Sequence, residues 1–164
     1  MIDRMKTRLS SEQGFTLIEL LVVIIILGIL LAIAVPSYLS FKDRANKSAA
    51  AANVRAVLPD IESYNADNVP GGTNDPDAST ADSGYTGMTI NILTSKYDQA
   101  FPGGVWVNTA ANDASAAALP TGVTAVAASA TNYCVIAQNG NWFAWKLGPG
   151  GVIKTDTTPA NVCT

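Results

Sequence analysis

A long apolar run dominates the N-terminal part of the chain. Between Phe15 and Val35 it is interrupted only by Thr16, Glu19 and Gly28. A helix needs about 20 apolar residues to cross the hydrocarbon layer of a bilayer. The pattern therefore predicts a helix of membrane-spanning length, with one carboxylate, that of Glu19, near its start.

The helical spacing of apolar residues continues beyond this run, while charged residues fall on other faces. The positions on the apolar stripe are Tyr38, Phe41, Ala45, Ala49, Ala52, Ala56, Ile61 and Tyr64. We predict one helix over residues 15–65, roughly 75 Å long, with an amphipathic second half. Proline lacks an amide donor and clashes with the preceding turn, so Pro36 should kink or locally unwind this helix. Pro59 should either do the same or end the helix.

The C-terminal half has the pattern of a small sheet. Residues 67–86 are rich in Gly, Pro, Asp, Ser and Thr, which predicts a loop, and residues 88–101 have room for a short helix. Asn139-Gly140 is a strong hairpin signal. Predicted strands are 122–129, 133–138, 142–147 and 152–155.

These elements predict an α+β fold, in which a long N-terminal helix packs on an antiparallel sheet of three or four strands. The aromatic residues Trp142, Phe143 and Trp145 are expected to seal the sheet against the helix. Core packing is a commoner role for such a cluster than ligand binding.

Composition narrows the function classes. The chain has 164 residues, a one-domain length, and a net charge of -3, which argues against direct nucleic-acid binding. It has no histidine, which excludes Ser-His-Asp and Cys-His catalysis and His-ligated zinc. No other catalytic constellation and no cofactor motif is visible, so we expect neither an enzyme nor a cofactor.

The two cysteines, Cys134 and Cys163, make a poor metal site by themselves. Behind an export-like N-terminal segment, a disulfide formed in an oxidising compartment is the favoured interpretation. A bridge would contribute roughly 3–4 kcal/mol by the loop-entropy treatment.

The loop carboxylates Asp67, Asp75, Asp77 and Asp82 leave calcium as an alternative, because calcium prefers oxygen ligands. Their spacing does not match an EF-hand loop. Solvated loop acids are the commoner explanation, and no metal site is predicted.

Three interpretations of the N-terminus are open. Arg4, Lys6 and Arg8 precede the apolar run, so the leader should stay inside and the rest should lie outside. An ordinary signal peptide could be cut after the Ala-x-Ala pattern that ends at Ala34, and an uncleaved anchor is also possible. Both leave Glu19 without a role, although an acid inside a membrane helix costs on the order of 3 kcal/mol and normally has a partner.

The third interpretation rests on a resemblance. The segment GFTLIELLVVIIILGILLAIAVPSY (residues 14–38) closely resembles the N-terminal segment of type IV pilins and of the type II secretion and competence pseudopilins. The resemblance implies that prepilin peptidase cuts after Gly14 and methylates the new N-terminal residue, Phe15. It also implies that Glu19 pairs with the Phe15 amine of a neighbouring subunit and so sets the register of a filament.

The same resemblance implies a division of the chain. Residues 1–14 form the cleaved leader, 15–36 the hydrophobic helix of the membrane and filament core, and 37–164 the exported globular domain. The first half of the helix is expected to protrude, with a kink at Pro36. A Cys134–Cys163 disulfide would bound a variable surface loop, which is typical of pilins and not of major pseudopilins.

The function that this implies is a structural subunit of a type IV pilus, used for motility, adhesion or DNA uptake. Expected partners are further copies of the chain, prepilin peptidase, the inner-membrane assembly machinery and minor pilins. The subunit would be a single-pass membrane protein before assembly and part of a cell-surface filament afterwards. The alternatives are a secretion or competence pseudopilin, and, from a different class, a secreted enzyme or binding module with an ordinary signal peptide.

Overall fold

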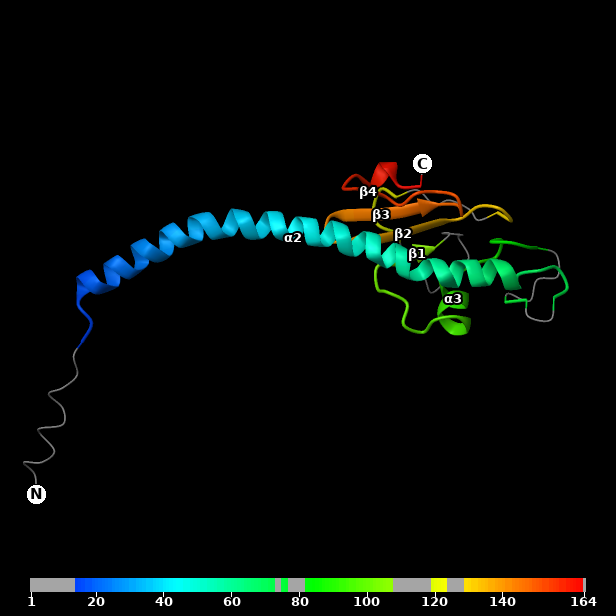
Figure 1. Ribbon diagram of the computed structural model, residues 1–164, viewed down its shortest axis with the longest axis horizontal. Helices are drawn as coiled ribbons and strands as arrows, with labels where there is room; N and C mark the ends of the chain where they lie inside the picture. The colour runs from blue at the N-terminus through cyan, green and yellow to red at the C-terminus, as the bar shows by residue number, and fades with distance from the viewer. Residues whose placement is uncertain (1–13, 73–74, 77–81, 108–118, 124–128, 164) are drawn as a thin grey trace, which may run out of the picture. The chain divides into compact units, whose positions relative to one another are not determined.

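The computed structural model of the chain describes residues 14–72, 75–76, 82–107, 119–123 and 129–163. They form an α+β fold, as predicted, in two compact units, residues 1–42 and 43–164. One long helix, α2 (Leu17–Asp67), supplies the described helical part of the first unit and the first element of the second (Figure 1). The two units are described separately below.

Helix α2 has 51 residues and lies two residues further along the chain than predicted. Its helical assignment continues through Pro36 and Pro59, so the expected local unwinding at Pro36 is wrong and Pro59 does not end the helix. Near each proline a serine hydroxyl donates to a carbonyl four residues earlier. Ser37, next to Pro36, donates to the Ile33 carbonyl at 3.2 Å, and Ser63 donates to the carbonyl of Pro59 itself at 2.9 Å. A kink at Pro36 stays a prediction.

The end of α2 follows from its sequence. A proline at position 70 disfavours helical geometry at the residue before it, and Gly71 has a φ of 71°, which a glycine adopts without strain. The Asn68 amide still donates to the Tyr64 carbonyl at 2.8 Å. The Asn68 side chain then donates to the Gly84 and Thr86 carbonyls at 3.0 and 2.9 Å, which ties the returning loop to the helix end.

The described part of the second unit has a four-stranded antiparallel sheet of order β1-β2-β3-β4. Its strands are β1 (Val105–Val107), β2 (Cys134–Asn139), β3 (Trp142–Leu147) and β4 (Lys154–Asp156). The β2–β3 hairpin is confirmed, but its two-residue turn is Gly140-Asn141, because Asn139 pairs with Trp142. Gly140 has a φ of 57°, which favours glycine in this turn, and a Cβ there would lie 2.6 Å from the Asn46 side-chain nitrogen, which would have to move.

Other elements differ in part from the predictions. Strand β1 was not predicted. At the ends of the predicted strand 122–129, Gly122 lies in a turn and Ser129 makes an isolated bridge to Asn132, while 124–128 lie outside the described residues. The short helix is confirmed as α3 (Ile90–Lys96), capped by Thr89, whose hydroxyl accepts from the Ile92 amide at 3.3 Å. A 3-10 turn, η1 (Pro159–Asn161), follows β4.

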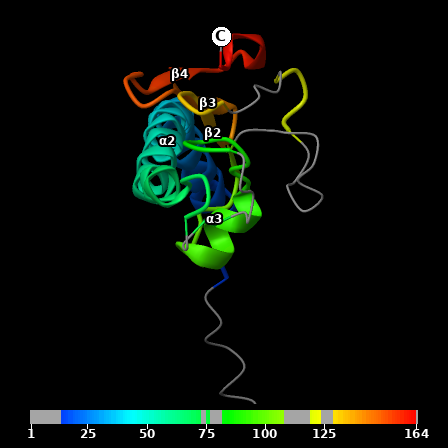
Figure 2. The same ribbon diagram turned by 90° about the vertical axis from the view of Figure 1, so that its right-hand side faces the viewer.

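The main core lies between the sheet and the second half of α2, with α3 beside them (Figures 1 and 2). Its buried helix residues recur every three or four positions and so line one face of α2. They are Ala50, Val54, Val57, Ile61 and Tyr64. Facing them are alternate sheet residues, Val105, Val107, Val135, Ala137 and Ala144.

A second core covers the opposite face of the sheet. Cys134, Ile136, Phe143 and Trp145 alternate with the residues of the main core and pack with Val162 and Cys163 from the C-terminal segment. The prediction that Phe143 and Trp145 seal the sheet against the helix is therefore wrong, because strand alternation directs them to the other face. Trp142 does contact α2, since its Nε1 donates to Asp43 Oδ1 at 2.7 Å.

Candidate functional site

The start of α2 has a polar cap formed by Thr16 and Glu19. The Glu19 amide donates to the Thr16 hydroxyl oxygen at 3.2 Å, and this hydroxyl donates to Glu19 Oε2 at 3.5 Å. The spacing is that of a capping box, Thr-x-x-Glu, which satisfies amides that a helix start leaves without partners. A carboxylate also interacts favourably with the positive end of the helix dipole. The cap therefore fixes the Glu19 carboxylate in the first turn.

Phe15 and Glu19 lie beside one shallow hollow on the surface of this turn, together with Leu20 and Val23. Phe15 precedes the helix, so this shared hollow, and not helical spacing, brings it close to Glu19. Gly14 and Phe15 precede the helix and are both exposed, Phe15 by 83%. The Gly14–Phe15 bond thus lies in accessible, non-helical chain, while cleavage there and methylation of Phe15 stay predictions.

The rest of α2 in the first unit has an apolar surface all round. Its large hydrophobic side chains from Leu17 to Phe41 are each at least 45% exposed. Among the described helices, α2 is the one that is long and apolar enough to cross a membrane, a test that a signal sequence near the N-terminus also passes. A helix apolar on every side needs an apolar environment supplied from outside the unit.

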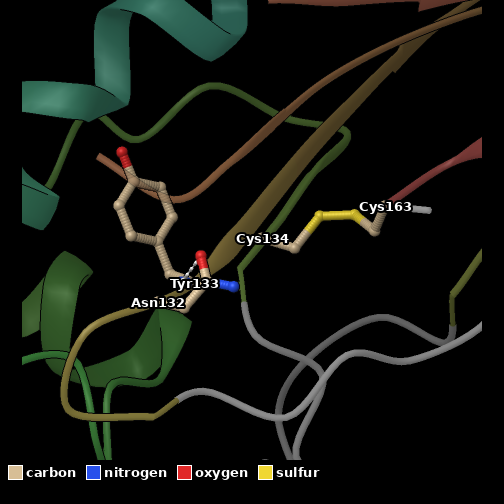
Figure 3. Close-up of a disulfide and its surroundings, with 4 residues drawn as sticks. All are labelled: Asn132, Tyr133, Cys134 and Cys163. Carbon is tan, nitrogen blue, oxygen red and sulfur yellow. Dashed lines mark hydrogen bonds between the residues drawn. A yellow bond between two sulfur atoms is a disulfide. The ribbon is translucent and has the colours of Figure 1, made fainter. Parts of the chain in front are cut away.

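The Cys134–Cys163 disulfide is present, as predicted, and joins β2 to the C-terminal segment (Figure 3). The two Cα atoms lie 6.1 Å apart, across a sequence separation of 29. Figure 3 shows that Tyr133 and Cys134, which are adjacent in the chain, point in opposite directions. The bridge thus holds the C-terminal segment on the sheet face that does not face α2.

A polar network crosses the main core. The Tyr85 hydroxyl donates to Glu62 Oε2 at 2.8 Å, and the Tyr133 hydroxyl donates to Glu62 Oε1 at 3.5 Å. Lys146 is buried, and its ammonium donates to the Tyr133 hydroxyl at 3.1 Å and to the Pro149 carbonyl at 2.7 Å. The ammonium is therefore linked to a carboxylate of α2 through one phenol.

Burial shifts the pKa values of the tyrosine and lysine side chains in this network. Burial, with the hydrogen bond to Glu62, raises the pKa of Tyr85 to about 12. Burial and the Glu62 charge also raise the pKa of Tyr133, and burial lowers the pKa of Lys146. This network was not predicted from the sequence. Lys146, a lone charge within the strand WFAWKL, was the signal that could have revealed it.

The loop carboxylates do not gather into a metal site in the described part of the chain. No group of three or more acidic, cysteine or histidine residues there could hold a metal ion. Asp67 instead accepts a hydrogen bond at 3.0 Å from the Tyr97 hydroxyl. Asp77, another of the four residues of the calcium alternative, lies outside the described residues.

Comparison with known proteins finds similarity at the N-terminus. Residues 9–35 match the family model of the prokaryotic N-terminal methylation motif. The chain is 42% identical over 58 residues to the type II secretion system core protein G of Pseudomonas aeruginosa, covering 35% of this chain and 41% of that protein.

Two type IV pilins are also similar. The type IV major pilin protein PilA of Myxococcus xanthus is 44% identical over 53 residues, covering 32% of this chain and 24% of that protein. The type IV narrow pilus major component PilA5 of Thermus thermophilus is 53% identical over 45 residues, covering 27% and 39%. The chain spans less than half the length of each of these relatives. No solved structure is significantly similar to it.

These matches confirm the resemblance. The chain has a prokaryotic N-terminal methylation motif, and its N-terminal third is similar to both type IV pilins and type II secretion pseudopilins. The matched region contains the capped start of α2 and its apolar half.

Proposed function

We propose that this chain is the structural, non-catalytic subunit of a type IV pilus. Prepilin peptidase cuts after Gly14 and methylates Phe15, and the processed subunit is held in the membrane by residues 15–36. Assembly machinery then polymerises it into a cell-surface filament. The observation that supports this most is the methylation motif at residues 9–35, which overlaps the start of a helix whose large apolar side chains are exposed among the described residues of their unit.

The chemistry at the start of α2 fits this role. Cleavage would create a cationic amine at Phe15, beside the same hollow as Glu19. In the uncleaved chain, the Glu19 carboxylate accepts a hydrogen bond from the neutral Thr16 hydroxyl, at 3.5 Å. A carboxylate left unpaired in hydrocarbon costs on the order of 3 kcal/mol, and pairing with the amine of a neighbouring copy offsets that cost. Such a pair would align each incoming subunit.

A pilus is preferred to a secretion pseudopilus because of the disulfide. Core protein G and the pilin PilA match the N-terminal region at similar identity, so that region does not separate a secretion pseudopilus from a pilus. The Cys134–Cys163 bridge holds the C-terminal segment on the outer sheet face, and the resemblance associates a C-terminal disulfide with pilins and not with major pseudopilins. A pseudopilin remains the second candidate on the similarity to core protein G.

The test is the exact mass and N-terminal peptide of the protein from its native host. The expected chain begins at N-methylated Phe15 and has Cys134 and Cys163 joined. A chain that begins at Val35 would instead show an ordinary signal peptide and overturn the proposal.

A substitution at the proposed cleavage site tests processing without disturbing the fold. A Cβ at Gly14 would meet nothing within 4 Å, so Gly14→Leu should leave the fold intact and block cleavage. Gly28→Ala is the matched control, because a Cβ there also meets nothing within 4 Å and the residue is far from the cleavage site. Normal processing of Gly14→Leu would contradict the proposed cleavage site.

A further inference from the structure

Charge is unevenly distributed along the part of the chain that follows the apolar segment. Arg44 and Lys47, here called the basic collar, are exposed and lie three residues apart in the first turns of the second unit. From residue 48 onward the chain has four basic and nine acidic residues. The collar is thus a local positive site on an otherwise acidic domain.

A tryptophan from the β2–β3 hairpin lies beside the collar. Trp142, at the start of β3, donates from Nε1 to Asp43 Oδ1 at 2.7 Å, and Lys47 Nζ lies 4.8 Å from the centre of its ring. The Asp43 carboxylate, next to the collar in the chain, therefore accepts a hydrogen bond from the indole. Tryptophan, with an apolar body and one polar N–H, is enriched where proteins meet the membrane interface.

The collar lies on α2 just beyond the expected depth of the lipid headgroups, with Arg44 nearer to them than Lys47. Residues 15–36 span roughly 30 Å of helix, about the thickness of the hydrocarbon layer. Arg44 follows eight residues later, at about 12 Å along the helix. The headgroup layer of roughly 5–8 Å ends short of Arg44, but long basic side chains reach back toward it, and its electrostatic potential decays over a Debye length of about 8 Å.

We propose that Arg44 and Lys47, with Trp142 beside them, bind the headgroups of anionic phospholipids on the exported side of the membrane. This inference rests on the proposed membrane-held subunit. The contact would anchor the start of the second unit at the bilayer surface until the subunit leaves the membrane. Leaving would then require the collar to exchange lipid phosphates for another partner or for water.

A second copy of the chain is the competing occupant, because the domain also has a negative site. Asp60 and Asp98 are both half-buried, and burial together with the Asp98 charge raises the pKa of Asp60. A basic residue of another copy would relieve this repulsion. The lipid is favoured because the depth of the collar and the adjacent tryptophan both point to the membrane interface.

The experiment uses the full processed chain in phosphatidylcholine vesicles containing small amounts of spin-labelled phosphatidylglycerol or spin-labelled phosphatidylcholine. The fraction of motionally restricted label gives the preference of the protein for the anionic lipid. We expect a clear preference for phosphatidylglycerol in the parent, and a several-fold reduction in R44Q/K47Q. Raising the salt to about 0.5 M should have the same effect in the parent.

Two variants serve as controls. R55Q/K154Q makes the same change in net charge at two other exposed basic residues, and it should keep the preference. R44K/K47R keeps the collar's charge and should keep it too. Near-UV circular dichroism checks that each variant retains its folded second unit.

Every outcome bears on the proposal. Equal restriction of both labels in the parent, or an unchanged preference in R44Q/K47Q, would overturn the lipid contact. If R44Q/K47Q kept the lipid preference but failed to associate with other copies, the collar would be assigned to a second copy. Flotation of the parent on neutral vesicles tests the anchor separately: failure to float at any composition would overturn the proposed function, whereas flotation without a lipid preference would overturn only the collar.

Discussion

The two halves of α2 belong to one helix but have different environments. In the second half, Val54 and Ile61 have no exposed surface and pack against the sheet. In the first half, Ile25 is 52% exposed and its neighbours are similar. The second half is stabilised by burial within its own unit, whereas the first has an apolar surface that water does not favour. The apolar surface of the first half is therefore available to a partner outside the chain, whereas that of the second half packs within its own domain.

The largest expected effect is on assembly by the first half. We predict that Glu19→Val leaves a processed, membrane-held subunit but lowers filament yield more than about tenfold, because the Phe15 amine of the neighbour loses its partner. The measurement is sheared-filament yield with the variant as the sole subunit. Glu19→Gln is the informative control, since it keeps the size and the capping hydrogen bond but not the charge. Normal yield from Glu19→Gln would show that the cap, and not the charge, is what matters.

The disulfide should matter only for the second unit. Replacing both Cys134 and Cys163 with serine should lower the free energy of unfolding of that unit by about 3.5 kcal/mol. The outer core of Phe143 and Trp145 should become accessible as the C-terminal segment detaches. Urea unfolding in detergent, followed by tryptophan fluorescence, measures both effects. Membrane flotation should be unchanged, and a loss of flotation would contradict the separation of the two halves.

A pair of matched truncations compares the halves directly. Ile61→Ala removes a fully buried side chain from the main core, so we expect a loss of about 2–5 kcal/mol in the unfolding free energy of the second unit. Ile25→Ala makes the same chemical change at an exposed position and should leave that free energy unchanged. Urea unfolding of both full-length variants in the same detergent measures the two changes in unfolding free energy. A similar loss in both would show that the first half contributes to the stability of the domain.

The structure of the first half of α2 could largely be predicted from the sequence. A continuous apolar run has one simple structural solution, which needs no tertiary information. The helix bounds were therefore predicted to within two residues. The hydrogen bonding of Glu19 to Thr16 was not predicted, although the Thr-x-x-Glu spacing before an apolar run is a sequence signal for it.

The structure of the second unit could be predicted from the sequence only in part, because its strands and core depend on contacts between residues far apart in the chain. Strand β1 has three residues, too few to show alternation, and is held by pairing with β2. The outer position of Phe143 and Trp145 depends on the C-terminal segment that covers them, and a local pattern does not reveal that cover. The disulfide could be predicted, because only two cysteines were present.

The smallest predicted effect concerns the polar network of the second unit. Tyr85→Phe removes the hydrogen bond to Glu62 and should cost about 1 kcal/mol of unfolding free energy at neutral pH. In the parent, the folded state keeps the Tyr85 phenol protonated up to about pH 12, whereas the unfolded chain ionises near 10. The folded state then binds more protons, so this contribution to stability is present below pH 10 and is lost as the pH rises through about 12.

Two neighbours in the network also depend on pH. Tyr133 has a raised pKa and acts in the same direction as Tyr85, whereas Lys146 has a lowered pKa and adds stability as the pH rises toward its unfolded value near 10. The Tyr85→Phe variant should therefore lose stability less steeply than the parent between pH 10 and 12. Urea unfolding across this range, with phenolate absorbance as a second signal, measures the two slopes. Identical slopes would show that the Tyr85–Glu62 contact does not link the ionisation of Tyr85 to folding.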